Sequence, residues 1–479
     1  MGTKDVYFIG ICGIAMGSLA GMFKEAGFSV RGSDSNVYPP MSDILAGAGI
    51  PVYSGFSEEQ VGSPGLVVIG NAISRGNPEV EYVLNASLPY TSMAGALYSH
   101  FLHDREVIAV AGTHGKSTTS ALLAHILQSA GLDPSYFVGG VLRNYDSNYR
   151  LGKGGYFVIE GDEYDSAFFE KVPKFIFYRP RHCVLTSLEF DHADIYRDLA
   201  EIELWFRRLV NTVPSQGHIV YSSAYETLAR ALSGSRSALS SYGETGDYSW
   251  SFSGYEGDDA LVTLTSPSGR LALRTPLFGS FNYENITAAA AMALELGVPP
   301  ESVQKGIASF LGVKRRQELI FSRENLRVYE DFAHHPTAIS LVLDTMRHRF
   351  PGAVIWAVYE PRSATSRRNV FQNELPRALL KADHALIKTP FNLDVIPAPD
   401  RIDAARVRDD IAAGGGDARL CASVDEIIGI ITGNISPDRN NIIVIMSNGG
   451  FDGIYAKLTG SLDRLFTVRG AGPGSDKLN

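Results

Sequence analysis

The chain has 479 residues, of which 45% are hydrophobic and 20% are charged, so it can form about three globular domains of ordinary size. A formal net charge of −9 without a basic run argues against nucleic acid or a membrane as a partner, and no obligatory protein partner is evident. Three widely spaced cysteines match neither a disulfide framework nor a paired metal site and fit a reducing, cytoplasmic compartment.

The N-terminal residues are typical of a nucleotide-binding β-α-β unit. We predict a strand at 6–9, a glycine turn at 10–13, a helix at 15–26 and a strand at 29–34. Gly10 and Gly13 are candidate ligand contacts, although the strict Gly-x-Gly-x-x-Gly pattern is absent. Asp34 lies where an acid accepts a ribose hydroxyl in such units, and a solvated carboxylate at the end of a strand explains it equally well.

A further strand is predicted at 66–69, and the polar turn 70–78 follows it. Strands of such sheets present their ligands in the loops at their carboxyl ends. Asn71 and Ser74 lie in this turn and are therefore candidate binding residues.

A phosphate loop is predicted at 112–119, Gly-Thr-His-Gly-Lys-Ser-Thr-Thr, between an apolar strand at 107–111 and a helix at 120–130. Its glycines let backbone N–H groups face a polyphosphate, Lys116 would reach the outer phosphates, and Ser117 would hold Mg²⁺. The loop is a shortened variant, because Val110 replaces the first glycine of the common pattern. The alternative is a glycine turn with a solvated lysine, but the flanking elements favour ATP hydrolysis.

The middle of the chain should continue this domain. We predict a polar loop at 143–155, a strand at 156–160 that ends in Glu160, and a strand at 183–187. Glu160 is a candidate second magnesium ligand or an ordinary carboxylate at the end of a strand. The stretch 233–276 reads as short antiparallel strands.

Asn282 and Asn285 precede a helix predicted at 286–296 and can present two amides on one face, although Asn282 could instead cap the helix. After about residue 313, β-α alternation returns, with strands predicted at 326–330, 353–359, 384–387 and 442–446. We therefore predict three α/β domains in series, at 1–104, 105–313 and 314–479.

Six motifs in this order resemble the Mur ligases, the ATP-dependent amide-forming enzymes of bacterial peptidoglycan. They are Gly112-Thr-His-Gly-Lys-Ser117, Glu160-Gly-Asp-Glu-Tyr-Asp165, Asp191-His192, Phe281-Asn-Tyr-Glu-Asn285, Lys314-Arg-Arg316 and Asp331-Phe-Ala-His-His-Pro-Thr337. The resemblance implies a Rossmann-like N-terminal domain for a UDP-sugar, a central P-loop ATPase domain, and a Rossmann-like C-terminal domain for the incoming amine.

Within that family, the chain is most similar to the branch that uses UDP-N-acetylmuramate. Four segments favour the ligases that add the murein tripeptide L-Ala-γ-D-Glu-meso-diaminopimelate during peptidoglycan recycling: 32–42, 70–78, 360–363 and 446–451. The alternative within the branch is the L-alanine-adding ligase of de novo synthesis. Folylpolyglutamate synthase is a further alternative, which the N-terminal β-α-β unit disfavours. A nucleotide-binding regulator that has lost its chemistry is another, which the retention of Lys116, Ser117, Glu160, His192 and Asp331 disfavours.

The resemblance also implies roles for individual residues, with ATP and Mg²⁺ as cofactors. The muramate carboxylate would attack the γ-phosphate, and the peptide amine would then displace phosphate from the acyl phosphate. Lys116, His192 and His335 would be catalytic, and Ser117, Glu160 and His192 would bind metal. ATP would contact Gly112, Thr113, His114, Gly115, Lys116, Ser117, Thr118, Asn282, Asn285, Arg316 and Asp331; the UDP-sugar Gly10, Gly13, Asp34, Asn71 and Ser74; and the peptide His334, Arg362 and Asn448.

Three further expectations concern charged residues. His334 and His335 are adjacent on a loop without a third ligand nearby, so substrate contact is favoured over a metal site. Lys314 and Arg315 are expected to be solvated linker charges. Several Mur ligases carry a carbamoylated lysine after the magnesium histidine, whereas 192–210 contains no lysine here and Arg207 occupies the matching place.

Overall fold

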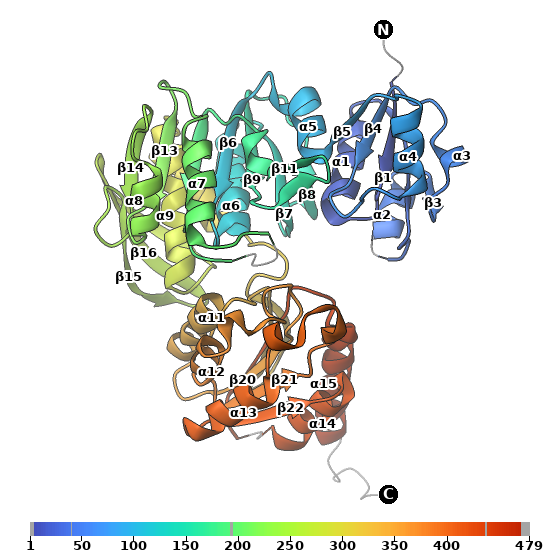
Figure 1. Cartoon of the computed structure of the whole chain (residues 1–479). Helices are drawn as coiled ribbons and strands as arrows, with labels where there is room; N and C mark the ends of the chain where they lie inside the picture. Colours follow the sequence, from blue (N-terminus) through green and yellow to red (C-terminus); the bar gives the residue numbers. More distant parts are fainter. Residues whose placement is uncertain (1–3, 40, 192–194, 436–437, 471–479) are drawn as a thin grey trace, which may run out of the picture. The chain divides into compact units, whose positions relative to one another are not determined.

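The computed structural model describes residues 4–39, 41–191, 195–435 and 438–470. The chain divides into two compact units. Unit 1 takes in the residues up to 190, 197–277 and 283–312, whereas unit 2 takes in 191–196, 278–282 and the residues from 313 on. The sheets of both units are shown in Figure 1.

The first sheet of unit 1 is parallel and has the strand order β3-β2-β1-β4-β5. Its elements are β1 (Asp5–Ile9), α1 (Ile14–Glu25), β2 (Ser29–Asp34), α2 (Met41–Gly47), β3 (Val52–Ser54), α3 (Glu58–Val61), β4 (Leu66–Ile69), α4 (Pro78–Asn85), β5 (Tyr90–Ser92) and α5 (Met93–Leu97). After β1, the chain adds β2 and β3 on one side of it and then β4 and β5 on the other side. The strand order therefore reverses between β1 and β4, and sheets of this kind bind ligands at such a topological switch point.

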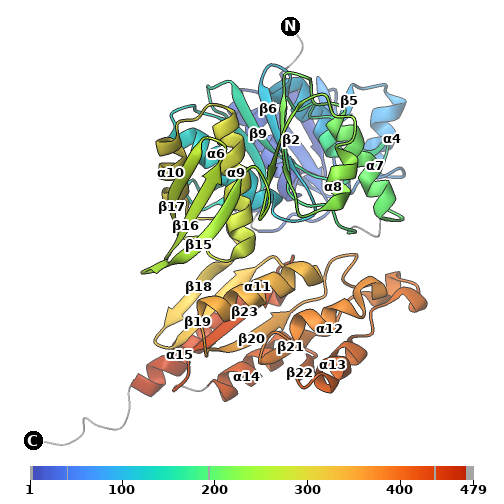
Figure 2. The ribbon, with the colours of Figure 1, turned by 90° about the vertical axis from the view of Figure 1, so that its left-hand side faces the viewer.

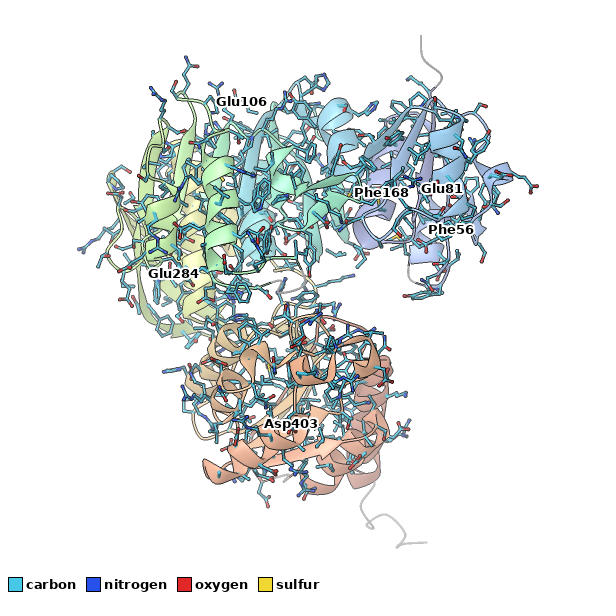
Figure 3. The ribbon with its side chains drawn as sticks, viewed as in Figure 1. Phe56, Glu81, Glu106, Phe168, Glu284 and Asp403 are labelled. Carbon is cyan, nitrogen blue, oxygen red and sulfur yellow. The ribbon has the colours of Figure 1, made fainter. Side chains whose placement is uncertain are left out.

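The core of this sheet is built from apolar strand residues such as Tyr7, Ile9 and Val67, all fully buried. Phe56 and Phe168, both labelled in Figure 3, pack against this cluster. Phe168 follows β10 (Asp165–Ala167), which forms an antiparallel hairpin with β11 (Glu170–Pro173). The hairpin therefore extends the core of the first sheet with residues from the middle of the chain.

The second sheet of unit 1 has the order β14-β13-β12-β6-β9-β7-β8. Its strands are β6 (Glu106–Ala111), β7 (Ser135–Leu142), β8 (Ser147–Arg150), β9 (Tyr156–Gly161), β12 (His182–Leu185), β13 (His218–Ser222) and β14 (Ala238–Tyr242). The helices of this region are α6 (Lys116–Ser129), α7 (Leu199–Val210), α8 (Glu226–Ala231), α9 (Ser280–Glu295) and α10 (Pro300–Ser309), and β15 (Ser249–Glu256), β16 (Asp259–Ser266) and β17 (Gly269–Thr275) form a separate antiparallel sheet. β6 lies in the middle of the second sheet, so the loop after it opens at the centre of the carboxyl edge.

Three local predictions for unit 1 were wrong. The predicted loop 143–155 contains β8, an edge strand that pairs in antiparallel with β7, and Arg150 at its end forms an ion pair with Asp133 at 2.5 Å. β14 was expected in the antiparallel excursion but pairs in parallel with β13. The helix of the phosphate loop begins at Lys116 rather than at residue 120, since the loop itself supplies its first turn.

Unit 2 contains one sheet with the order β18-β19-β23-β20-β21-β22, parallel except for β18. Its strands are β18 (Glu318–Arg323), β19 (Leu326–Asp331), β20 (Val354–Tyr359), β21 (His384–Lys388), β22 (Asp417–Cys421) and β23 (Asn441–Met446), and its helices are α11 (Pro336–Arg349), α12 (Glu374–Leu379), α13 (Ala404–Ala413), α14 (Val424–Asn434) and α15 (Ile454–Gly470). In β23, Ile442 and Val444 pack with α11, α12 and α13, whereas Ile443 and Ile445 pack with α14 and α15. Figure 2 shows the two helix layers on opposite faces of this sheet. The α/β fold class predicted for this part of the chain is confirmed.

Candidate functional site

The phosphate loop is shaped by two glycines. Gly112 has φ +147°, and a Cβ there would lie 2.8 Å from the Ser187 backbone nitrogen. Gly115 has φ +80°, is the N-cap of α6, and would overlap the Asn285 side chain if it carried a Cβ. Both positions therefore need glycine, because of left-handed backbone and of close packing. The loop leads from the end of β6 into the N-terminus of α6, the arrangement that binds phosphate.

Lys116 is held as a largely buried cation within this loop, with 14% of its side chain exposed. Its Nζ donates hydrogen bonds to Gly112 O at 2.6 Å and to Glu163 Oε1 at 2.9 Å. Burial lowers the pKa of Lys116, but the carboxylates of Glu163 and Glu160 outweigh this effect, and the pKa lies above its ordinary value. Lys116 is therefore charged at neutral pH, as phosphate binding requires. Glu163 was not among the predicted site residues, although it lies in the acidic run that follows β9.

Two of the three predicted metal ligands come from a helix and a strand of the same domain region, α6 and β9. Ser117 is buried in the first turn of α6, and Glu160 is the fifth residue of β9, directly paired with Val110 of β6. Glu160 Oε2 accepts a hydrogen bond from Gly139 N at 2.8 Å. A hydroxyl and a carboxylate are oxygen donors of the kind that Mg²⁺ prefers. The third predicted ligand, His192, lies outside the described residues.

The segment after β12 forms hydrogen bonds with the phosphate loop. His114 N donates to Ser187 Oγ at 2.8 Å, and the His114 ring lies 2.8 Å from Glu189 Oε2. Thr113 is fastened as well, since its hydroxyl accepts a hydrogen bond from Glu189 N at 2.9 Å. Thr113, His114 and Thr118 thus lie in or beside the loop, as the ATP-binding prediction requires.

The two asparagines of α9 have different surroundings. Asn285 Oδ1 accepts from the Thr119 hydroxyl at 3.2 Å beside the phosphate loop. Asn282 Nδ2 donates to Phe278 O at 3.0 Å and to Gln317 Oε1 at 2.8 Å. The alternative in which Asn282 caps the helix is wrong, because α9 begins at Ser280 and the Asn282 amide donates within the first turn.

The predicted nucleotide-sugar residues gather at the switch point of the first sheet. Asp34 Oδ2 accepts from Cys12 N at 2.9 Å, which ties the glycine turn to the end of β2. A Cβ on Gly10 would lie 3.1 Å from the Ile73 side chain, so the turn after β1 and the loop after β4 are in contact. Asn71 and Ser74 lie in that loop, and Gly13 precedes α1. The Asp34 carboxylate thus has a structural role, which leaves its predicted contact with ribose open.

In unit 2, the end of β19 carries the next group of predicted residues. Asp331 accepts from Gln317 N at 2.8 Å and from Ala333 N at 2.7 Å. Burial raises the pKa of Asp331, and the charge of Arg316 only partly offsets this effect. The Arg316 guanidinium lies 4.5 Å from the centre of the Phe332 ring. Arg316 and Asp331 are thus brought together around one turn.

The adjacent histidines follow in the same loop. His334 Nδ1 lies 3.0 Å from Phe332 O. His335 is the N-cap of α11, where its Nδ1 accepts from Thr337 N at 3.2 Å, and its ring lies 4.5 Å from that of Phe371. His335 therefore has a structural role in addition to the catalytic role predicted for it.

Arg315 is a site residue that the sequence did not reveal. The expectation that it is a solvated linker charge is wrong, because its Nε lies 2.6 Å from Glu330 Oε1 and its Nη2 donates to Gly449 O at 2.6 Å and to Ser447 O at 3.1 Å. No local signal could have shown this, since 134 residues separate Arg315 from Gly449. Arg315 fixes the loop after β23, in which the predicted peptide-binding residue Asn448 lies.

Arg362 reaches the same loop from the end of β20. Its Nη1 lies 3.3 Å from Glu360 Oε1, and a Cβ on Gly449 would overlap its Cδ and Nε. Among the described residues, the buried Asn448 Oδ1 has no hydrogen-bond partner. Arg362, one of the three predicted peptide-binding residues, thus packs against the loop in which Asn448, another of them, lies.

The arrangement in unit 1 can bind a polyphosphate and neutralise it with a lysine and a metal ion. The arrangement in unit 2 offers guanidinium, amide and imidazole groups along one sheet edge. In the described part of the chain, no helix is long and apolar enough to cross a membrane.

Family models match most of the chain. Residues 5–105 match the catalytic domain of the Mur ligase family, residues 110–293 the Mur ligase middle domain, and residues 315–449 the glutamate ligase domain of the Mur ligases. These matches cover in order the first sheet, the phosphate loop with its surroundings, and the unit 2 sheet.

Individual relatives agree with the family models. The UDP-N-acetylmuramate–L-alanyl-γ-D-glutamyl-meso-2,6-diaminoheptandioate ligase of Escherichia coli (strain K12) is 38% identical over 95% of this chain and 98% of its own. The UDP-N-acetylmuramate–L-alanine ligase of Arthrobacter sp. (strain FB24) is 33% identical over 90% of both chains. The crystal structure of a murein peptide ligase from Psychrobacter arcticus superposes with a TM-score of 0.71 at 36% identity, covering 95% of this chain and 98% of that one.

Proposed function

The chain belongs to the Mur ligase family, and from this premise we propose that it joins L-Ala-γ-D-Glu-meso-diaminopimelate to UDP-N-acetylmuramate with hydrolysis of ATP to ADP. The observation that carries the proposal is the 38% identity, over nearly the whole of both chains, to the Escherichia coli ligase named for this tripeptide. Such a reaction lets a cell reuse murein peptide. L-alanine is the alternative amine, because several ligases named for it also match this chain, at 29% to 33% identity.

The first step brings two anions together. The muramate carboxylate oxygen attacks the γ-phosphorus of ATP, the bond to the bridging oxygen breaks, and ADP leaves with its electron pair. Lys116 lies in the phosphate loop as a largely buried cation and lowers the repulsion between the carboxylate and the γ-phosphate. The N-terminus of α6 adds backbone N–H groups on the same side.

In the second step the free amine of the tripeptide attacks the acyl carbon. A tetrahedral intermediate forms, phosphate leaves with the electron pair of the broken bond, and the proton lost by the amine nitrogen passes to the released phosphate or to solvent as the amide is completed. Positioning supplies much of the rate, since the amine must be held against a short-lived acyl phosphate. We assign this positioning to the unit 2 edge, where His334, Arg362 and Asn448 lie.

Magnesium is the metal that this site fits best. Ser117 and Glu160 offer a hydroxyl and a carboxylate on neighbouring elements, and we propose that they hold one Mg²⁺, with His192 as a ligand of a second. When bound, Mg²⁺ neutralises phosphate oxygens and orients them.

The remaining assignments follow from this reaction. We propose that the UDP-sugar contacts Gly10, Gly13, Asp34, Asn71 and Ser74, and that ATP contacts 112–118 together with Asn282, Asn285, Arg316 and Asp331. The domain boundaries that we propose are 1–104, 105–313 and 314–479. Because ATP and a UDP-sugar are the substrates, we place the reaction in the cytoplasm.

The test is ADP release from the full chain with ATP, Mg²⁺ and UDP-N-acetylmuramate, with either the tripeptide or L-alanine as the amine. Turnover with the tripeptide at least about tenfold faster than with L-alanine is expected. Preference for L-alanine would make the chain the alanine-adding ligase. No amine-dependent ADP release with either compound would overturn the assignment to ligation.

A further inference from the structure

The acidic run that follows β9 brings three carboxylates beside the phosphate loop. They are Glu160, Asp162 and Glu163, and β9 is the direct neighbour of β6, the strand that leads into the loop. Glu163 Oε1 lies 2.9 Å from the Nζ of Lys116. Three carboxylates balanced by a single lysine would repel a polyphosphate, which is itself an anion. A second cation is therefore needed close to this run.

Lys174 supplies that second cation. Its Nζ donates a hydrogen bond to Asp162 Oδ2 at 2.7 Å and lies 5.7 Å from the centre of the Tyr164 ring. Only 9% of the Lys174 side chain is exposed. Lysine is seldom buried unless it is paired, and an apolar side chain would fill the same place without the cost of removing a charge from water. The burial of an ammonium group here indicates that its charge serves a purpose other than packing.

The backbone holds the two partners of this ion pair together. The hairpin of β10 and β11 lies between them in the chain, and Phe168 in its turn packs against the core of the first sheet. At the base of the hairpin, Lys174 N donates to Tyr164 O at 3.0 Å, and Phe175 N donates to Asp162 O at 3.4 Å. The Asp162 side chain is fixed as well, because its Oδ1 accepts a hydrogen bond from Tyr164 N at 3.0 Å. The ion pair is thus ordered before any nucleotide binds.

Asp162 interacts with both lysines. Burial raises the pKa of Asp162, but the ammonium groups of Lys174 and, more weakly, Lys116 outweigh this effect and hold the pKa below its ordinary value. The charges therefore alternate in the order Lys174, Asp162, Lys116, Glu163. If Lys174 were absent, the Asp162 carboxylate would be left to attract the Lys116 ammonium, which is the group that has to face the phosphates.

We propose that Lys174 is a positioning residue for the nucleotide, because its ion pair with Asp162 keeps this carboxylate from competing with the phosphates for Lys116. The inference rests on the proposed function, since it takes ATP as the ligand of the phosphate loop, and it adds Lys174 and Asp162 to the residues that shape this site. It has a distinctive consequence. The two partners of one ion pair should have opposite effects on nucleotide binding when each is neutralised alone.

The test measures the Kd of ADP for the full chain by isothermal titration calorimetry in the presence of EDTA, so that neither a metal ion nor turnover contributes. Lys174→Met should raise the Kd by about tenfold, because the Asp162 charge is no longer balanced. Asp162→Asn should lower the Kd by about threefold, because one carboxylate fewer acts on Lys116. The double variant should return to within about twofold of the wild type, since both charges are gone.

The matched control is Lys171→Met. Lys171 forms an ion pair with Asp165 in the same hairpin, but its side chain is 66% exposed, so this change should leave the Kd of ADP within about twofold of the wild-type value. With Mg²⁺ present, KM for ATP should follow the same order among all the variants as the Kd of ADP.

A pair with a purely structural role would give a different pattern. Both single variants would then bind ADP more weakly, and the double variant, which also lacks the pair, would not recover. That pattern, or a Kd for Lys174→Met within about twofold of the wild type, would overturn the inference. Failure of the proposed function is seen separately, as absence of tripeptide ligation by the wild-type chain, and the ADP titrations do not depend on which amine is used.

Discussion

The phosphate-loop edge of unit 1 and the carboxyl edge of unit 2 differ in how their polar groups are assembled. The residues of the phosphate loop lie in one continuous stretch, 112–118, that joins a strand to a helix. The unit 2 edge is assembled from turns far apart in sequence, with Arg315 bonded to Gly449 across 134 residues. A local motif can be identified in the sequence alone, whereas groups brought together by the sheet become visible only when the strand order is known.

The largest effect on catalysis is expected at the phosphate-loop edge of unit 1. Lys116→Ala should lower kcat by at least about 10³-fold, because the γ-phosphate loses the cation that offsets its charge when the carboxylate approaches. Lys171→Ala is the control, because the Lys171 side chain is 66% exposed in its ion pair with Asp165. The kcat of this variant should stay within about twofold of the wild-type value. ADP release measures both. A Lys116→Ala protein that keeps more than a tenth of the wild-type rate would contradict the role of the loop.

At the carboxyl edge of unit 2, substitution of Arg315 should instead change the free energy of unfolding. Arg315→Ala should lower the free energy of unfolding of unit 2 by about 3–5 kcal/mol, since it leaves Glu330 buried without its guanidinium partner. Hydrogen exchange in β23 as a function of urea measures this locally. The control is Arg323→Ala, which removes an exposed ion pair with Asp463 and should change the same free energy by less than about 0.5 kcal/mol. Equal effects of the two changes would mean that the tie to the β23 loop contributes little.

The free energy of unfolding of unit 1 should depend on pH through His125, which lies in α6, the helix after the phosphate loop. Burial lowers the pKa of His125 to about 4, from an ordinary value of 6.5, and its ring nitrogens contact the Tyr145 hydroxyl at 2.7 Å and the Ser309 hydroxyl at 2.9 Å. The unfolded chain therefore takes up a proton first, and stability present above pH 6.5 is lost as pH falls towards 4. From this group alone, the loss amounts to about 3 kcal/mol.

His125→Gln removes the titration while keeping a side chain that can form hydrogen bonds. The free energy of unfolding of unit 1 should thus fall by about 3 kcal/mol less in the variant than in the wild type between pH 7 and pH 4. Urea titrations at the two pH values give this difference. Parallel pH profiles for the two proteins would show that His125 is as readily protonated in the folded chain as in the unfolded one.

The smallest expected effect compares two neighbouring glycines of the unit 2 edge. Gly449→Ala places a Cβ where the Arg362 side chain lies, whereas a Cβ at Gly450 meets nothing within 4 Å. Displacement of Arg362 should raise KM for the tripeptide by several-fold, up to about tenfold, and leave KM for ATP unchanged. Gly450→Ala should alter neither constant. If both substitutions had the same small effect, the position of Arg362 against this loop would not matter for the peptide.

Much of the fold could be predicted because its signals are local. Apolar strands at 6–9, 66–69 and 442–446 followed by glycine turns or helices specify parallel α/β sheets, and the structure has strands there. The edge strand β8 was missed, since Ser147, Asn148 and Arg150 are polar and its neighbour in the sheet is β7, which lies earlier in the chain. Secondary structure that depends on tertiary partners leaves little trace in sequence.

The candidate site follows the same rule. Lys116 and Ser117 could be assigned because their roles depend on position within one motif. Glu163 and Arg315 could not, because a partner residue gives each its role: Lys116 in one case and the loop after β23 in the other.

Selection of the tripeptide rather than L-alanine by this ligase is tested most directly by competition between the two amines. The wild-type chain is given ATP, Mg²⁺ and limiting UDP-N-acetylmuramate, with equal concentrations of both amines, and the products are resolved by mass spectrometry. The account predicts that the UDP-N-acetylmuramyl tripeptide forms in at least about tenfold excess. A product mixture dominated by UDP-N-acetylmuramyl-L-alanine would contradict it.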